Sequence, residues 1–517
     1  MVLVKGMLQP LDSRRWDLKD AARLLWRAGF GGPPHEAEAL LALGPEGAVE
    51  RLLGAPDAAA LDEGPDLGLD SGDPMPRKRD RDALNAEEKK KALRLARARE
   101  AGGLATARGW WLARMADPAK AAREKMVLFL HGHFATSADK VRSPRLLLAQ
   151  NRLFRRHAFG AWHDLCLGVA KDPAMLIYLD NAKSRAGNPN ENFAREFFEL
   201  FALGEGNYTE KDIQESARAF TGWSLATEMR EFVIRKPWHD GGTKTVFGKT
   251  GNFGGEEIVG LTLKQPAAAA LLAGKLWRFY AGSEPSAELR EALAAELRDG
   301  GFNLGKFLRT IFRCGEFYDP SLDFLRIKSP VEWLVGLCRA LEMPLPHPAV
   351  ASFALAELGQ DLFRPPNVKG WDGGLAWINT ATLARREEIA ASLIRGGRTE
   401  NDWSRRAARR LAAFFAMGQE SEMSGEARQE AQKRVFVETT RAPVDMTRIL
   451  PRERRLSEEA VVGDLWWRLN GRMPAREDRD AALEAARKIE PTGVWTDDSA
   501  REMAVTLACA PSFQLSC

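Results

Sequence analysis

Apolar residues recur every three or four positions over most of the chain, which is the spacing that places them on one face of a helix. The segment Leu18–Trp26 shows this pattern behind Asp17, a residue type preferred at helix N-termini, and glycines and prolines at 29–34 end it. Similar patterns fill residues 104–225, 266–341 and most of the C-terminal part. The sequence therefore predicts a mainly α-helical protein with a multi-helix core.

One stretch near residues 229–263 departs from this pattern. Phe232–Ile234, Thr245–Phe247 and Ile258–Leu263 are rich in β-branched and aromatic residues and are separated by glycine-rich turns, which is typical of strands. We therefore expect a small inserted β-hairpin or a long irregular loop within the helical core.

Shifts in charge and in turn residues divide the chain further. Residues 55–80 are rich in Asp, Gly and Pro, and a densely charged helical pattern follows them. The four expected regions are an N-terminal helical segment (1–55), a charged loop and helix (56–103), a central helical core that carries the motifs (104–395) and a C-terminal helical region (396–517).

Composition excludes several classes of protein. The 517 residues are 45% hydrophobic, too many for a disordered chain, yet no apolar run reaches the roughly 20 residues that span a bilayer. The formal net charge of +4 gives no support for a nucleic-acid-binding protein. The N-terminus lacks a basic region followed by an apolar core, so we expect no signal peptide and a cytoplasmic location.

The first candidate site is the motif His131-Gly132-His133, which follows a short apolar run. In a regular helix, residues two apart point away from each other, whereas a break at Gly132 would let both imidazoles reach one point. Buried histidines that converge are a common arrangement of metal ligands. The alternative is that they cap a helix end by hydrogen bonds. His157 is a further candidate ligand, although a lone helical histidine is more often a core residue.

The second candidate is the helical segment Asn190–Leu203, in which phenylalanines form an apolar stripe and charged residues lie largely opposite. Glu196 and Glu199 are three positions apart, so their carboxylates are close enough to share a cation or a proton. Arg195 could hold an anionic substrate group or a developing negative charge. A surface helix would show the same pattern and is the alternative.

Two loops carry polar and aromatic residues at breaks in the helical pattern. Trp238-His239-Asp240 lies in the irregular stretch, and such loops hold reactive groups over a rigid scaffold. The other loop covers residues 364–379, where prolines and glycines fix the backbone. That surface suits a sugar ring or a peptide, or it fills a gap between domains. Its candidate binding residues are Arg364, Asn367, Lys369, Trp371 and Trp377.

The chain contains 15 tryptophans but only 4 tyrosines. Most tryptophans fall in helical patterns typical of a core, while four fall at breaks beside the polar motifs, namely Trp223, Trp238, Trp371 and Trp377. We expect these four to bind ligand, so that replacing them spares stability and weakens binding.

Seven segments carry motifs that are specific enough to compare with known protein families. They are residues 24–31, 124–137, 151–157, 172–180, 189–223, 239–240 and 365–371. Together they resemble a bacterial family catalogued as domain of unknown function 1800, and the resemblance covers nearly the whole chain. It implies a sulfatase-like partner protein, because members are often encoded beside that family. Members are also often exported, whereas this chain shows no export signal.

The leading functional hypothesis is a metal-assisted, hydrolase-like enzyme. A divalent cation would activate a water molecule, and a carboxylate that does not bind the cation would act as the general base. The ligands would be His131 and His133 with Glu196 or Glu199, and His157 or His239 could add a further one.

Two other hypotheses remain open. One is a non-catalytic binding or assembly protein that recognises a polysaccharide or a partner protein, with Arg195 paired to Glu196 or Glu199 in a structural network. The other is a metal-free, carbohydrate-active enzyme with paired carboxylates, such as Glu199 with Asp180 or Asp240.

Overall fold

The computed structural model describes residues 6–54, 61, 64–67, 82, 84–226, 231–323, 325–396, 401–418 and 442–516. Within them the chain is mainly α-helical with small β elements, which confirms the predicted fold class. The loop predicted over residues 55–80 lies largely outside the described part. No helix in the described ranges is both long enough and apolar enough to cross a membrane.

The N-terminal helices begin as the sequence predicts. α1 spans Leu18–Ala28, and the Asp17 carboxylate accepts a hydrogen bond from the backbone N–H of Asp20, which satisfies a donor left open at the helix start. The next helices are α2 (Pro34–Ala42), α3 (Gly44–Leu53) and α6 (Ala86–Ala116). Because α6 is continuous, the predicted boundary at residues 103/104 falls inside it.

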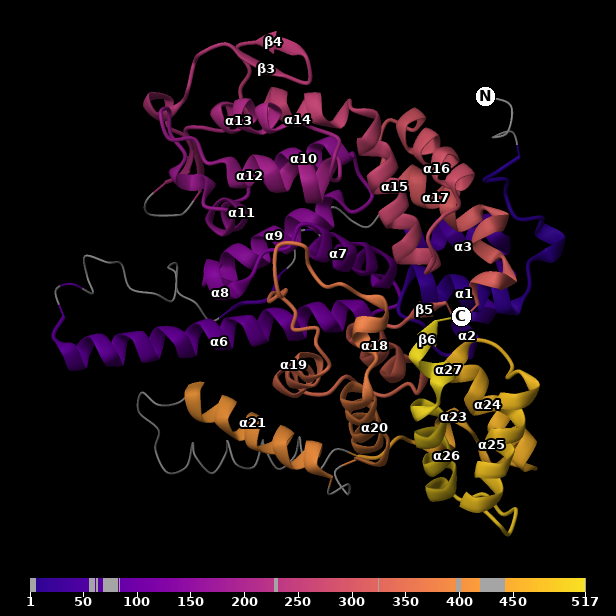
Figure 1. Ribbon diagram of the computed structural model, residues 1–517. Coiled ribbons are helices and arrows are strands. Elements are labelled where there is room, and N and C mark those ends of the chain that lie inside the picture. The colour runs from indigo at the N-terminus through magenta and orange to yellow at the C-terminus, as the bar shows by residue number, and fades with distance from the viewer. Residues whose placement is uncertain are drawn as a thin grey trace.

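The central core contains α7 (Ala121–His133) and the helices that follow it. These are α8 (Ala138–Val141), α9 (Pro144–His157), α10 (Trp162–Ala170), α11 (Pro173–Tyr178), α12 (Glu191–Glu196), α13 (Glu210–Ala219), α14 (Gly255–Leu263), α15 (Pro266–Ala281), α16 (Ala287–Asp299), α17 (Leu304–Arg313), α18 (Pro330–Ala340), α19 (Pro348–Glu357) and α20 (Thr380–Arg395). In Figure 1, α7 and α9 lie in the middle of the molecule, with α10 and α12 to α14 above them and α6 below.

The C-terminal helices form a group at the lower right of Figure 1, apart from α21, which lies at the lower left. They are α21 (Asp402–Gly418), α23 (Met446–Ile449), α24 (Glu458–Asn470), α25 (Arg476–Ile489), α26 (Asp497–Cys509) and α27 (Pro511–Gln514). The last strand, β6 (Leu515–Ser516), pairs antiparallel with β5 (Arg326–Ile327) and so returns the chain end to the core.

The predicted β element is present but smaller than expected. β1 (Trp223–Leu225) pairs antiparallel with β2 (Phe232–Ile234), and β3 (Lys244–Val246) pairs with β4 (Lys249–Gly251). Residues 258–263, which we expected to form a strand, belong to α14 instead. The acidic first turn of α14 favours a helix, and burial of its apolar face outweighs the β-propensity of its isoleucine and valine.

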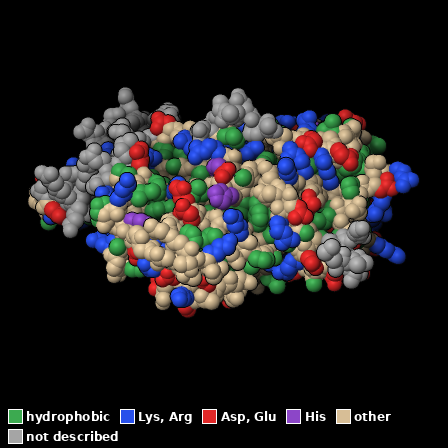
Figure 2. Space-filling model, turned by 90° about the horizontal axis from the view of Figure 1, so that it is seen from above, with side chains coloured by type: hydrophobic (Ala, Val, Ile, Leu, Met, Phe, Trp, Pro, Cys, Tyr) green, Lys and Arg blue, Asp and Glu red, His purple; other side chains and the backbone are tan. Residues whose placement is uncertain are grey.

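The surface carries charges of both signs close together. On the face drawn in Figure 2, Lys and Arg side chains are interspersed with Asp and Glu side chains. This distribution agrees with the small formal net charge of +4.

A buried carboxylate joins three helices of the core. Glu124, on α7, is 0% exposed. It accepts hydrogen bonds from Nε1 of Trp111 at 2.9 Å and from Nε of Arg114 at 2.8 Å, both on α6. Arg155, on α9, donates to both carboxylate oxygens at 2.6 and 2.7 Å. Because a buried carboxylate without such donors is costly, these bonds fix α6, α7 and α9 relative to one another.

The next residue ties α7 to other parts of the core. Nζ of Lys125 donates to the Gly29 carbonyl at 2.7 Å and pairs with Glu332 of α18. Glu332 also pairs with Arg326 of β5. Burial lowers the pKa of Lys125 to about 7, although the charge of Glu332 opposes this shift. Buried polar contacts therefore hold α7 on more than one side and fix the histidine motif at its end.

We predict that Glu124→Gln lowers the free energy of unfolding by about 3–5 kcal/mol, because the buried guanidinium of Arg155 would lose its charged partner. Urea denaturation followed by tryptophan fluorescence measures the change. The matched control is Glu256→Gln, which removes a more exposed ion pair with Lys171 and should cost less than about 1 kcal/mol. Equal losses in the two variants would contradict the role assigned to Glu124.

Candidate functional site

The histidine motif remains helical to its end. α7 includes His131, Gly132 and His133, so the expected break at Gly132 is not found. Residues two apart on a helix are rotated by about 200°, and the two imidazoles accordingly face different neighbours. The motif by itself does not bring its two rings to one point.

Each imidazole already has protein partners. Nε2 of His131 accepts a hydrogen bond from the backbone N–H of Phe363 at 3.1 Å. Nε2 of His133 lies 3.0 Å from the Phe201 carbonyl and must carry the proton, so Nδ1 accepts from Nζ of Lys275 at 3.3 Å. Burial lowers the pKa of His131 to about 3 and that of His133 well below its usual value, so both rings are neutral.

These hydrogen bonds occupy the ring nitrogens that the expected metal site would need. The unprotonated nitrogen of each ring, which is the atom that could bind a cation, accepts a bond from a protein donor. Over the described ranges, no group of three or more His, Cys, Asp or Glu side chains is placed to hold a metal ion. His157 ends α9, and its partial burial lowers its pKa. Metal binding at the motif stays a prediction, and it would require His131 and His133 to give up these donors.

The helix that carries the two glutamates changes its geometry halfway. α12 covers Glu191–Glu196, and a π-helix continues it over Phe197–Ala202. At its end the backbone N–H of Leu203 binds the Phe198 carbonyl, which lies five residues back. π-helical turns are uncommon and occur often at functional sites.

Side chains from two other helices hold the end of this π-helix. Nζ of Lys275, on α15, donates to the Leu200 carbonyl at 2.7 Å, and His133 donates to the Phe201 carbonyl. No described carboxylate forms an ion pair with Lys275, and burial lowers its pKa to about 8. His133 and Lys275 thus satisfy carbonyls at a helix end, where basic groups are favoured.

Glu196 and Glu199, which we call the glutamate pair, are partly buried on this turn. No described cation forms an ion pair with either carboxylate. The Tyr208 hydroxyl donates to Oε2 of Glu199 at 3.1 Å. Burial raises the pKa of Glu196, the charge of Glu199 raises it further, and Lys369 opposes the shift. A glutamate with a raised pKa beside a second carboxylate is an arrangement suited to proton transfer.

Two of the chain's 4 tyrosines lie beside the glutamate pair. Burial raises the pKa of Tyr208 to about 12, and its hydrogen bond to Glu199 adds to the shift. Burial also raises the pKa of Tyr178, and the charge of Glu196 adds to it. Both phenols therefore remain protonated at neutral pH.

Arg195 is occupied by other acids. Its guanidinium forms a bidentate pair with Glu210, with both contacts at 2.7 Å, and lies 3.6 Å from Glu191. These contacts raise the pKa of Arg195 further. Arg195 forms no described ion pair with Glu196 or Glu199, and holding an anionic substrate group would require it to leave its partners.

The loop of residues 364–379 crosses the end of α7. A Cβ at Gly370 would lie 2.3 Å from the Gly132 carbonyl oxygen, and the φ of +82° at this position also favours glycine. Trp371 then packs against His131, with ring centroids 5.5 Å apart. The close approach of the two glycines fixes this loop over the histidine motif.

The other candidate residues of this loop differ in their contacts. Arg364 pairs with Asp139 at 3.4 Å. Asn367 and Lys369 are exposed, and Oδ1 of Asn367 accepts a hydrogen bond from the backbone N–H of Lys369 at 2.8 Å. This turn presents Lys369 close enough to Glu196 to act on its pKa.

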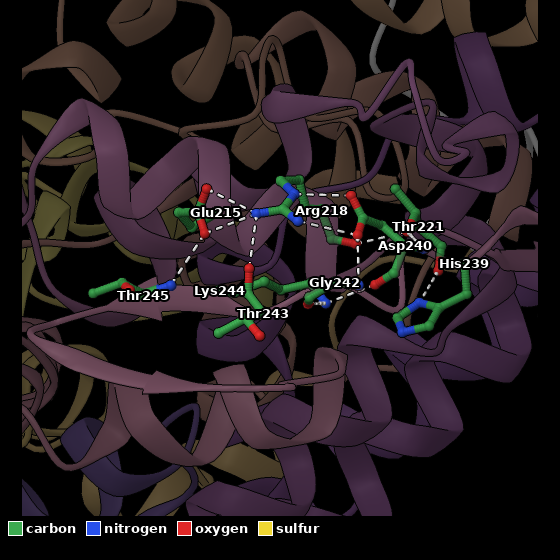
Figure 3. A network of polar contacts seen from close by, with 9 residues as sticks. All are labelled: Glu215, Arg218, Thr221, His239, Asp240, Gly242, Thr243, Lys244 and Thr245. Carbon is green, nitrogen blue, oxygen red and sulfur yellow. Dashed lines mark hydrogen bonds and ion pairs between the residues drawn. The ribbon is translucent and has the colours of Figure 1, made fainter.

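His239 and Asp240 belong to a separate polar network, which Figure 3 shows. Arg218 forms a bidentate pair with Asp240, at 2.8 and 3.1 Å, and lowers the pKa of Asp240 to about 2. Nδ1 of His239 lies 2.9 Å from the Thr221 carbonyl and donates its proton to it. Asp240 is thus an ion-pair partner of Arg218, and His239 is held by the backbone beside it.

The four tryptophans at the breaks differ in exposure. Trp223 and Trp377 are only 3% and 7% exposed. Trp238 and Trp371 are partly exposed. A ligand could therefore reach Trp238 and Trp371 without rearrangement of the core, and for these two a binding role stays a prediction.

Lys275, Tyr178 and Tyr208 are site residues that the motifs of the sequence did not predict. The sequence does contain an indication for Lys275, because this lysine interrupts the Ala- and Leu-rich first part of α15. Tyr208 precedes Thr209 and Asp212, whose reciprocal hydrogen bonds form a capping box at the start of α13, a pattern that by itself indicates only a helix start.

Comparison with known proteins adds a family but no activity. The model of the family described as "Protein of unknown function (DUF1800)" matches residues 23–515. No curated protein and no solved structure matches the chain. The match spans every candidate residue named above and confirms the resemblance found in the sequence.

We predict that His133→Ala lowers the free energy of unfolding by about 1–3 kcal/mol, because the Phe201 carbonyl and Lys275 each lose a buried partner. Urea denaturation measures this loss, with and without a chelator. If the role is capping, the chelator leaves the wild-type protein unchanged. If instead the chelator destabilises the wild type as much as the substitution does, His133 is a metal ligand.

Proposed function

This chain belongs to the DUF1800 family of proteins of unknown function, and we propose that it is a hydrolase-type enzyme that acts on a polysaccharide through Glu196 and Glu199. One observation carries the proposal: the glutamate pair is partly buried, mutually repelling and without a described ion-pair partner. Like charges held together reduce stability, and proteins retain such arrangements mainly where function needs them.

In the proposed reaction Glu196 is the general acid. Its raised pKa keeps more of it protonated near neutral pH than an ordinary glutamic acid. It donates this proton to the glycosidic oxygen while the bond from that oxygen to the sugar carbon breaks, and the leaving sugar departs as an alcohol.

Glu199 is the second carboxylate of the proposed reaction. The Tyr208 hydroxyl holds one of its oxygens at 3.1 Å and so limits its rotation. As a general base, Glu199 takes a proton from the water that attacks the sugar carbon. Protonated Tyr178 and exposed Lys369 are further donors to substrate hydroxyl groups.

A non-catalytic polysaccharide-binding protein is the second candidate function. It is favoured by the two arginines that lie against Trp238, whose guanidinium groups can bind acidic groups of a sugar polymer. The metal-assisted hydrolase, the sulfatase-like partner and the cytoplasmic location stay predictions.

We predict that Glu196→Gln and Glu199→Gln each reduce the rate of polysaccharide hydrolysis by about 10²–10⁴-fold, because each removes one proton-transfer group. Release of reducing ends from a panel of neutral and acidic polysaccharides measures the rate. The control is Glu191→Gln, on the same helix, whose carboxylate lies 3.6 Å from Arg195 and takes no part in the proposed reaction. Hydrolysis that survives both substitutions in the glutamate pair would refute the proposal.

The raised pKa of Glu196 has a consequence for stability that needs no substrate. Folding favours its protonated form, so the charged form lowers the free energy of unfolding at pH values above the folded-state pKa. The penalty is absent below the unfolded-state pKa, which is about 4.3.

Glu196→Gln should therefore raise the free energy of unfolding at pH 7, by up to about 1 kcal/mol because solvent screens a partly exposed charge. The gain should disappear as the pH is lowered to about 4. Urea denaturation at several pH values tests this. A variant that is less stable than the wild type at pH 7 would show that Glu196 is a structural residue.

A further inference from the structure

Two arginines, Arg185 and Arg235, lie against the ring of Trp238, and two lysines, Lys183 and Lys236, belong to the same chain segments. Lys183, Arg185 and Lys236 are exposed, and Arg235 is partly buried. We call these four residues and Trp238 the basic patch. Lys183 and Arg185 lie in the segment that precedes α12, whereas Arg235, Lys236 and Trp238 follow β2.

Backbone hydrogen bonds hold the segments of the basic patch together. The N–H of Ala186 donates to the Trp238 carbonyl at 2.7 Å, and the N–H of Gly222 donates to the Ser184 carbonyl at 3.0 Å. A Cβ at Gly222 would lie 2.9 Å from the Arg235 carbonyl oxygen, so this packing requires glycine. Residues far apart in the chain therefore meet here in a fixed arrangement.

Trp238 positions the two guanidinium groups. The guanidinium carbon of Arg185 lies 4.7 Å from the ring centroid, and that of Arg235 lies 5.1 Å from it. Contacts at these distances are attractive and hold each planar group against the ring. Because guanidinium groups cover the ring, it offers less surface for stacking on a sugar than the sequence suggested.

The basic patch lacks counter-charges among the described residues. The nearby acids are occupied elsewhere: Asp180 pairs with Lys140 at 2.6 Å, and Asp240 pairs with Arg218 at 2.8 Å. No described carboxylate pairs with Arg185 or with the other three basic residues. Gathering four like charges raises the electrostatic energy of the surface, and bound oxyanions would lower it.

We infer that the basic patch binds the carboxylate or sulfate groups of an acidic polysaccharide. This inference rests on the proposed function, for which it names the substrate class. Guanidinium groups bind such oxyanions through paired N–H donors. Lys183 and Arg185 precede α12, the helix that ends at Glu196, so the segment of the patch that carries them leads along the chain to the glutamate pair.

Single-stranded nucleic acid is the less favoured polyanion. Proteins that bind it without sequence preference use aromatic rings with an open face for the bases. The ring of Trp238 is covered by guanidinium groups instead. An acidic sugar polymer needs only the charged donors.

The test measures binding of the full chain to dextran sulfate, polygalacturonate and neutral dextran by affinity electrophoresis. We expect retardation by the two acidic polymers and none by neutral dextran. The double variant R185Q/K236Q should bind the acidic polymers at least about tenfold more weakly. The control is R309Q/R313Q, which removes two charges that pair with Glu50 and should bind like the wild type.

Three outcomes would overturn the inference. They are equal retardation by neutral dextran, unchanged binding of R185Q/K236Q, and tighter binding of a single-stranded oligonucleotide than of both acidic polymers. Glu196→Gln separates the inference from the proposed function. If this variant and the wild type bind the acidic polymers equally but the wild type does not cleave them, the proposed function fails and the basic patch stands. If the wild type cleaves them and R185Q/K236Q binds normally, only the inference fails.

Discussion

The structure depends on the buried carboxylate of Glu124. Its charge is tolerable in the core only because donors from α6 and α9 surround it, so three helices must meet at one place. The position of α7 along its axis and its rotation about that axis are therefore fixed. At the C-terminal end of α7, His131 therefore accepts a hydrogen bond from the backbone of Phe363, and His133 donates one to the π-helix. A shift of α7 would disturb both contacts at once.

The π-helix connects this scaffold to the site. His133 and Lys275 bind carbonyls at its end, while the glutamate pair lies at the junction of α12 with the π-helix and on the π-helix itself. Some acids near the site have basic partners, for example Asp240 with Arg218. The glutamate pair and the basic patch have no described partner of opposite charge. Their uncompensated charges are what a charged, polymeric substrate would use.

The sequence predicted a large part of the fold but less of the site. Local sequence patterns predicted the structure correctly where short-range hydrogen bonds determine it, as at the Asp17 N-cap of α1. They failed at residues 258–263, where tertiary burial and an acidic helix start outweighed β-propensity. Gly132 was expected to break its helix, but the helix continues through it, and its carbonyl oxygen instead meets Gly370, which lies 238 positions away in the chain and could not be read locally.

By itself the sequence determined that the chain is mainly helical, belongs with its family, and carries its polar residues in a few compact motifs. Periodicity and capping residues act over short distances along the chain, which is why these features could be read directly. Only the tertiary structure decided which charges are neutralised. In the folded protein Arg195 pairs with Glu210, and no described cation pairs with Glu196 or Glu199. The partner of a charged side chain depends on contacts between distant segments, and residue spacing does not encode those contacts.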